Sequence, residues 1–182
     1  MSSVYTTQNE LLLRNLMDFY RETDLLDKML SIISGESSIS LRIVDWFATN
    51  YSKMHWTQYQ RKGRPFKVYV DYKLKLKAYS KRRFDPFCRW DRITIPYKNN
   101  TYIETTIGQL NFFKWALENN VIDYIEENYV DIENDMNTRN STSRPKDGAG
   151  NNTKTRKKRE ELSISASKSI KKEDVEIVVS FN

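Results

Sequence analysis

The sequence predicts an α+β fold, with an N-terminal helical bundle, a mainly antiparallel sheet and a helical pair packed on the sheet. Two patterns carry this prediction. Apolar residues recur at helical spacing before residue 52 and again after residue 106, and between these parts they alternate with polar residues. The length of 182 residues suits one domain with an appendage. We therefore expect a single domain over residues 1–136, a flexible linker over 137–153 and a basic, β-prone tail over 154–182.

Three amphipathic helices are predicted in the N-terminal part. The first spans residues 9–20, where apolar side chains recur every three or four residues. The second begins at residue 23 or 24 and ends at Ser34, with Gly35 as its C-cap residue. The third begins near Ser40. We expect these helices to form one small bundle.

A period of two dominates residues 66–78. Apolar side chains occupy the even positions, and lysines and tyrosines occupy most of the odd ones. This alternation predicts a strand with an apolar face toward the core and a lysine-and-tyrosine face toward solvent. The run is longer than the usual strand of about 5–6 residues, so we expect a bend or a bulge in it.

A hairpin and two helices are predicted next. Residues 92–97 and 101–106 form the hairpin, and its turn contains two asparagines, which tolerate positive φ. Thr106 and Gln109 fit a capping box that opens a helix ending near residues 119–120. Another helix follows over about residues 121–129.

The composition changes after residue 136. Residues 137–153 contain only polar residues, proline, glycine and alanine, which is typical of a flexible linker. Beyond it, residues 171–174 predict a turn between two β-prone runs. The second run, residues 175–181, is so apolar that we expect it to add a hairpin to the sheet or to pair with a partner strand.

Charge is segregated along the chain. The net charge is +6, but residues 61–92 alone hold twelve basic and three acidic residues. Residues 123–135 hold six acidic residues and no basic one, and residues 154–159 are basic again. The basic and acidic blocks either fold against each other or form an electrostatic surface.

The basic residues in and around the predicted strand form a candidate nucleic-acid interface. Lysine and arginine attract phosphates without sequence preference, and exposed tyrosines can stack on unpaired bases. For Phe84, Phe87 and Trp90 we expect a place in the core rather than a stacking role. The candidate residues are Arg61, Lys62, Arg64, Lys67, Tyr69, Lys73, Lys75, Lys77, Tyr79, Lys81, Arg82, Arg83, Arg89, Lys154, Arg156, Lys157, Lys158 and Arg159.

Motifs of catalytic and metal sites are missing from the sequence. One cysteine, Cys88, and one histidine, His55, are too few for a structural zinc site. We expect the first to fill space in the core and the second to lie at the surface, although a catalytic pair requires only that they meet in space. Neither GxGxxG nor GxxxxGK[ST] occurs, and the acids Asp45, Asp71 and Asp85 show no diagnostic spacing. We expect no enzyme, no cofactor, no metal and no small-molecule substrate.

Membrane and secretion signals are also missing. No apolar run approaches the roughly 18 residues that a membrane helix needs, and the N-terminal residues lack the pattern of a signal peptide. We therefore expect no membrane partner, and a single cysteine fits a reducing compartment.

Four strings in the sequence are distinctive. They are residues 40–47 (SLRIVDWF), 66–79, 84–87 (FDPF) and 108–116 (GQLNFFKWA). Together, over roughly residues 25–136, they resemble an uncharacterised small-protein family of nucleocytoplasmic large DNA viruses, the giant viruses. The resemblance implies a viral factory in the host cytoplasm, or the virion, with the nucleus left open, and a large DNA genome nearby. It implies no active site.

These observations leave two hypotheses. The leading one is a non-enzymatic, basic viral protein that contacts DNA or RNA through the lysine-rich strand face and the basic tail. The alternative is a structural virion or minor capsid protein that uses the same surface and tail for protein contacts. Binding that weakens steeply with salt would favour the first hypothesis. Assembly with a capsid protein, without nucleic-acid binding, would favour the second.

Overall fold

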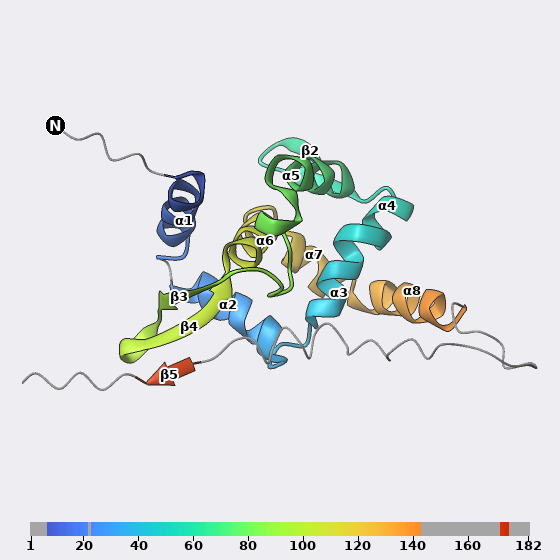
Figure 1. Ribbon diagram of the computed structural model, residues 1–182. Coiled ribbons are helices and arrows are strands. Elements are labelled where there is room, and N and C mark those ends of the chain that lie inside the picture. Colours follow the sequence, from blue (N-terminus) through green and yellow to red (C-terminus); the bar gives the residue numbers. More distant parts are fainter. Residues whose placement is uncertain (1–6, 22, 143–171, 175–182) are drawn as a thin grey trace, which may run out of the picture.

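The computed structural model describes residues 7–21, 23–142 and 172–174. Figure 1 shows the course of the chain. The elements, in chain order, are α1 (Gln8–Phe19), α2 (Thr23–Ser34), α3 (Leu41–Trp46), the π-helix η1 (Phe47–Tyr51), α4 (Ser52–Met54), β1 (Gln58–Arg61), β2 (Arg64–Lys67), α5 (Val68–Arg83), β3 (Arg92–Pro96), the 3₁₀-helix η2 (Lys98–Asn100), β4 (Thr101–Thr106), α6 (Ile107–Glu118), α7 (Val121–Glu127), α8 (Tyr129–Thr142) and β5 (Lys172–Asp174).

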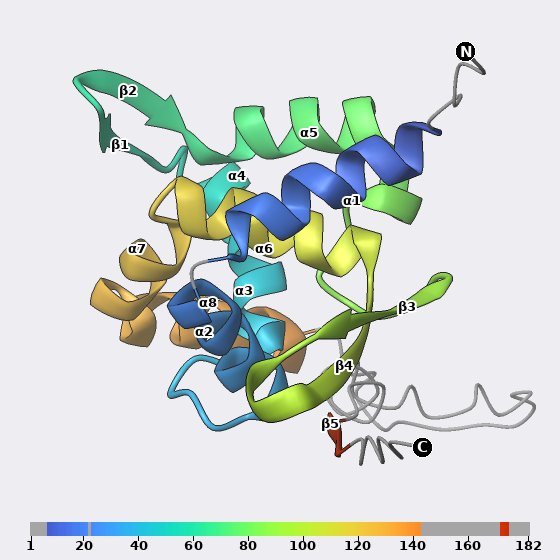
Figure 2. The ribbon, with the colours of Figure 1, turned by 90° about the vertical axis from the view of Figure 1, so that its left-hand side faces the viewer.

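Helix α6 lies at the centre of the molecule. Helices α1 and α5 both pack against it (Figure 2), and Phe112 and Phe113 of α6 are fully buried. The hydroxyl of Tyr20, just after α1, donates to the carbonyl oxygen of Leu110 at 2.8 Å. Helix α3 packs on α8, so the main packing partners of α1 and α3 are C-terminal helices and not, as predicted, the other N-terminal helices. The α+β fold class is confirmed.

The N-terminal helices lie where the sequence predicts them. Thr7 and Glu10 form a capping box at the start of α1, because each side chain accepts the other residue's backbone N–H. Helix α2 ends at Ser34, and Gly35 follows with φ of +80°. The hydroxyl of Ser40 caps α3. This third helix continues through η1 into α4.

Two small antiparallel sheets complete the fold. Strands β1 and β2 form a hairpin whose two turn residues, Lys62 and Gly63, both have positive φ. Strands β3 and β4 form the predicted hairpin, and Asn99 and Asn100 in its turn also have positive φ. Strand β5 pairs with residues 101–103 of β4, so the second sheet has the order β3–β4–β5.

The prediction of one strand over residues 66–78 is wrong. Strand β2 ends at Lys67, and helix α5 begins at Val68. Val68, Tyr72, Leu76 and Tyr79 also recur at helical spacing, and α5 turns this stripe toward the core. The even positions Val70 and Leu74 are left exposed. The length of the run favours a helix over a strand, and leucine, lysine and alanine are good helix formers.

The C-terminal part also departs from the prediction. Helix α7 begins at Val121 as expected, but α8 follows it and continues to Thr142, so residues 137–142 are helical and do not belong to a linker. Residues 172–174 form β5 instead of a turn. The rest of the predicted linker and tail, including Lys154, Arg156, Lys157, Lys158 and Arg159, lies outside the described residues. No helix among the described residues is both long and apolar enough to cross a membrane.

Candidate nucleic-acid interface

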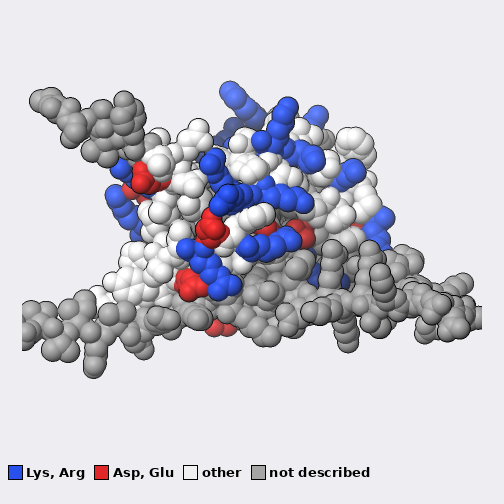
Figure 3. All heavy atoms as spheres, viewed as in Figure 1, with Lys and Arg blue, Asp and Glu red and all other residues white. Residues whose placement is uncertain are grey.

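Most of the predicted cations gather over α5 and the β1–β2 hairpin, the upper part of the molecule in Figure 3. Three lie in or beside the turn of the hairpin, one ends β2, and four lie on α5. The helix breaks at Ser80, which has a non-helical φ of 62° and ψ of 168°. We call this surface the basic face, and it consists of Arg61, Lys62, Arg64, Lys67, Lys73, Lys75, Lys77 and Lys81.

The charge of the basic face is not neutralised by the acidic block. Within residues 7–21, 23–142 and 172–174, none of its eight cations forms an ion pair. Two of the six acids of residues 123–135 pair elsewhere: Asp123 with Lys28, and Asp135 with His55 and Arg139. Of the two alternatives for the charge blocks, this pairing pattern favours an electrostatic surface.

Three predicted arginines lie outside the basic face. Arg82 pairs with Asp91 at 2.5 Å, both on the surface. Arg89 holds the buried carboxylate of Asp85 with two N–H groups, at 2.9 and 3.1 Å. Arg83 donates to the side chain of Gln8 at 3.3 Å. The charges of Arg82 and Arg89 are therefore compensated within the protein.

Helix α5 is fixed by the contacts of its core-facing side. The indole N–H of Trp115 on α6 donates to Asp71 at 2.7 Å. The ring of Tyr72 packs between Phe84 and Trp115, with centroids 5.8 and 5.9 Å away, and burial raises the pKa of this tyrosine to about 12. Because these contacts lie on one side of α5, Lys73 and Lys77 project from the other side into solvent.

The buried FDPF segment anchors the end of α5. The amide of Asn111 donates to the carbonyl oxygen of Arg83 at 2.8 Å, and the side-chain amide of Gln109 donates to that of Pro86 at 2.9 Å. The N–H of Asp85 donates to the carbonyl oxygen of Gly108 at 3.2 Å. These buried polar groups are satisfied across the junction of α5 and α6, so they fix the position of α5.

The capping box predicted for α6 is only half formed. The hydroxyl of Thr106 accepts the N–H of Gln109 at 3.1 Å, as predicted. The side chain of Gln109 does not accept the backbone N–H of Thr106, as a full capping box requires. Instead it accepts from the hydroxyl of Thr105 and donates to the carbonyl oxygen of Pro86. A residue that fits a local cap is therefore used in a long-range contact.

The β1–β2 hairpin is anchored at the junction of α6 and α7. The hydroxyl of Tyr59 donates to the carbonyl oxygen of Asn119 at 2.6 Å, and its ring stacks on Tyr124 at 5.2 Å. Arg61 donates through Nε to the carbonyl oxygen of Glu118 at 2.9 Å. One predicted site residue thus also holds the hairpin in place.

A polar cleft of about 260 Å³ opens between α5 and α6. Three cations line it, namely Arg61, Lys75 and Lys114, together with Asp71 and Glu118. The sequence did not indicate Lys114, because it lies outside the basic block, and only the packing of α6 on α5 brings it here. Its ammonium group is 3.7 Å from Glu118.

The aromatic candidates separate into buried and exposed side chains. Phe84 and Phe87 are buried, as expected, whereas Trp90 is 43% exposed and contradicts the expected core position. Tyr79 is half-buried and stacks on Phe84, so its ring is not free for a base. Tyr69 is also half-buried, and the ammonium of Lys53 lies 5.7 Å above its ring.

The single histidine and cysteine lie in different environments. His55 is exposed, stacks on Tyr51 at 4.1 Å and approaches Asp135 at 3.5 Å, while Cys88 is buried, as the sequence predicts. In the described part of the chain, no group of three or more His, Cys, Asp or Glu residues is placed to hold a metal ion. Burial, and after it the negative charge of Asp85, raise the pKa of Asp45 from 3.8 to about 6, against the opposing effects of Arg89 and Lys81.

Comparison with known proteins places the chain in a family. Residues 3–182 match DUF7197, which is described as a family of unknown function. The chain belongs to this family. It is also 43% identical, over 136 residues, to "Uncharacterized protein L507" of Acanthamoeba polyphaga mimivirus. The match covers 70% of this chain and 52% of the mimivirus protein, so the chain spans about half the length of that relative.

The comparisons confirm the resemblance to an uncharacterised family of giant viruses, which the sequence strings had indicated. No solved structure matches the chain.

Proposed function

We propose that this protein is a non-enzymatic nucleic-acid-binding protein whose basic face contacts the phosphate backbone of DNA or RNA. One observation carries the proposal: eight cations lie on α5 and the β1–β2 hairpin, and no described carboxylate forms an ion pair with any of them. Phosphates attract such a surface because binding releases condensed counterions. A viral factory in the host cytoplasm, or the virion, is the setting in which we expect this activity.

The geometry of the basic face supports this function. Lys67 at the start of α5 and Lys77 on its third turn are about 15 Å apart along the helix axis, given a rise of about 1.5 Å per residue. The cations of the hairpin extend this row beyond the helix. The hairpin is held by the hydrogen bond of Tyr59 to Asn119 at the end of α6, and α5 by that of Trp115 on α6 to Asp71, so the elements that carry the cations are fixed in position. Such contacts position a nucleic acid without reading its sequence.

A structural virion or minor capsid protein is the second candidate. It is favoured by the exposed apolar side chains on the same helix, since Val70 is 48% and Leu74 is 59% exposed. A capsid partner with an acidic, partly apolar surface would fit this mixture of charge and apolar area.

The experiment is a binding titration of the full chain with fluorescein-labelled duplex and single-stranded oligonucleotides at several salt concentrations, read by anisotropy. The test variant is the double substitution Lys73→Gln and Lys77→Gln. For the duplex, we expect the slope of log K against log salt to become shallower by about 2. The variant loses two lysines, and each phosphate contact contributes about 0.9 to the magnitude of the slope.

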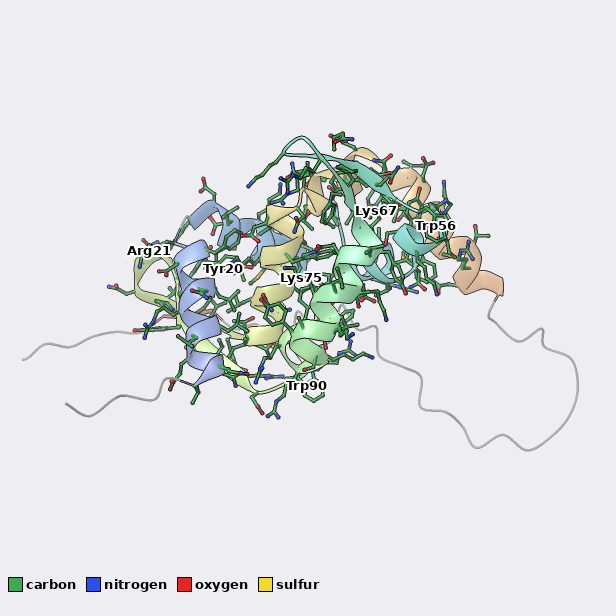
Figure 4. All side chains as sticks on the ribbon, turned by 90° about the horizontal axis from the view of Figure 1, so that it is seen from above. Tyr20, Arg21, Trp56, Lys67, Lys75 and Trp90 are labelled. Atoms are coloured by element: carbon green, nitrogen blue, oxygen red, sulfur yellow. The ribbon has the colours of Figure 1, made fainter. Side chains whose placement is uncertain are left out.

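The control variant is Arg21→Gln with Lys98→Gln, which removes the same charge elsewhere. Arg21 lies away from α5 (Figure 4), and Lys98 pairs with Asp27 beside the other hairpin. We expect the control to keep the wild-type slope. No binding at low salt, or an equal loss in both variants, would refute the proposal. Binding to a capsid protein alone would favour the second candidate.

A further inference from the structure

An open, largely apolar groove of about 480 Å³ lies where α4, the β1–β2 hairpin and the start of α5 meet. Tyr69 and Val70 of α5 form its apolar wall, and Trp56 stands at its edge. The buried Thr57 links the segment after α4 to α5, because its carbonyl oxygen accepts the N–H of Val68, the first residue of α5.

Trp56 is unusually placed for a tryptophan. Its side chain is 84% exposed. Its backbone has φ of 49°, a left-handed conformation that residues other than glycine adopt only at a cost in free energy. The large apolar ring therefore faces water in this structure. An exposed aromatic ring at the edge of an apolar groove is typical of a contact surface for a ligand.

The charges around the groove are positive. Lys53 and Lys67 both line it, and no described aspartate or glutamate does. Lys67 lies near Trp56 in Figure 4. Lys53 sits above the ring of Tyr69, so the apolar wall and a cation are presented together. This arrangement complements a ligand that joins flat apolar groups to negative charges.

The groove continues along α5. A second hollow of about 520 Å³ shares Tyr69 and Val70 with the first, and Lys73, Leu74 and Lys77 also line it. The two hollows form a track beside the helix, with exposed apolar side chains between lysines. Because the two hollows follow one another along α5, the track favours an extended polymer over a small ligand.

We propose that this track binds single-stranded nucleic acid, with an unpaired base stacked on Trp56 and the adjacent phosphates held by Lys53 and Lys67. This inference rests on the proposed function and adds to it the strandedness of the ligand. Sequence-tolerant binding of single strands combines a cationic groove with aromatic side chains on which bases stack. Bases in a duplex are stacked and paired, so a duplex can use the lysines but not the ring.

The test compares Trp56→Ala with the wild-type full chain, using a labelled oligothymidylate of about twelve nucleotides and a duplex of the same length. We expect the substitution to weaken single-strand binding by at least about fivefold, because the roughly 1–3 kcal/mol of one stacked base corresponds to a factor of about 5 to 150. Duplex binding should change by less than about twofold. Trp56→Phe, which keeps a ring, should retain part of the single-strand affinity.

The matched control is Trp90→Ala, which removes another exposed tryptophan, placed near the opposite end of α5 (Figure 4). We expect it to leave single-strand binding unchanged. Thermal unfolding of each variant would show that the fold is intact. Unchanged single-strand affinity in Trp56→Ala, or an equal loss for both ligands, would overturn the inference.

The outcomes separate this inference from the proposed function. Wild-type protein that binds the duplex and not the single strand would overturn the inference and support the function. Wild-type protein that binds an acidic peptide of similar length, and neither oligonucleotide, would overturn both.

Discussion

Replacing Asp45 with asparagine should raise the stability of the protein at neutral pH and have little effect at acidic pH. Asp45 lies on α3, and its carboxyl group is largely removed from water. Its pKa is raised from 3.8 to about 6, mainly by burial and also by the negative charge of Asp85, while Arg89 and Lys81 act in the opposite direction. At neutral pH the folded protein therefore holds a carboxylate where a neutral group is preferred.

The sign and size of the effect follow from proton linkage. Between about pH 4 and 6 the folded state binds more protons at Asp45 than the unfolded state, so stability falls as the pH rises through this window. The difference between 3.8 and about 6 corresponds to at most about 3 kcal/mol, since one pKa unit is worth about 1.4 kcal/mol. Asparagine cannot ionise and avoids this cost, and we expect Asp45→Asn to gain about 1–3 kcal/mol at neutral pH.

The assay is urea unfolding of wild type and variant at about pH 4.5, 6 and 7.5. The difference in unfolding free energy should be small at the lowest pH and grow toward the highest. Asp91→Asn serves as control, because Asp91 is exposed and paired with Arg82, and surface pairs contribute about 0–1 kcal/mol. A variant that is no more stable than wild type at pH 7.5, or a gain independent of pH, would show that the Asp45 reasoning is wrong.

Two further predictions concern the backbone around α5. Gly108→Ala should lower the unfolding free energy by about 1–2 kcal/mol despite the better helix propensity of alanine, because the added Cβ would lie 3.0 Å from the carbonyl oxygen of Arg82. The backbone there cannot easily move away, since Asn111 holds the carbonyl oxygen of the next residue, Arg83. Higher stability in urea unfolding would contradict this. Ser80→Gly should raise the melting temperature by relieving a φ of 62° and ψ of 168°, a region nearly restricted to glycine, with a net gain of about 1 kcal/mol. Ser80→Ala, which keeps the Cβ, should give no gain, and an equal gain from both variants would argue against strain.

The sequence predicts those elements whose signals are local. Capping residues and turn residues define α2, the β3–β4 hairpin and the start of α6, because a hydroxyl at an N-cap or an asparagine at positive φ acts within a few residues. Such features need no knowledge of distant contacts.

The course of residues 66–78 could not be decided locally. Val68, Val70, Tyr72, Leu74 and Leu76 satisfy a period of two, and the stripe that starts at Val68 also satisfies a helical period. The contacts of Tyr72 with Trp115 and Phe84 select the helix, and they come from residues far along the chain. The even positions on the outer side of α5 are left exposed as a result, which is why the groove beside Trp56 was not predicted.

The candidate site was predicted in composition but not in shape. The cations of the basic face were identified from charge density alone, which is independent of whether a strand or a helix carries them. Lys114 and Lys53 were missed, because only folding brings them beside Lys75 and Tyr69. A signal for the β1–β2 hairpin was present in Gly63, which permits the positive φ of a two-residue turn.

The residues that hold α5 in place differ from those that present its charge. Asp71, Tyr72 and the FDPF segment bind α6 on one side, whereas Lys73 and Lys77 project into solvent from the other. Surface substitutions away from packed features usually change stability by less than about 0.5 kcal/mol. Neutralising these lysines should therefore alter binding without unfolding the protein, so a loss of affinity in the lysine variants can be assigned to the basic face itself.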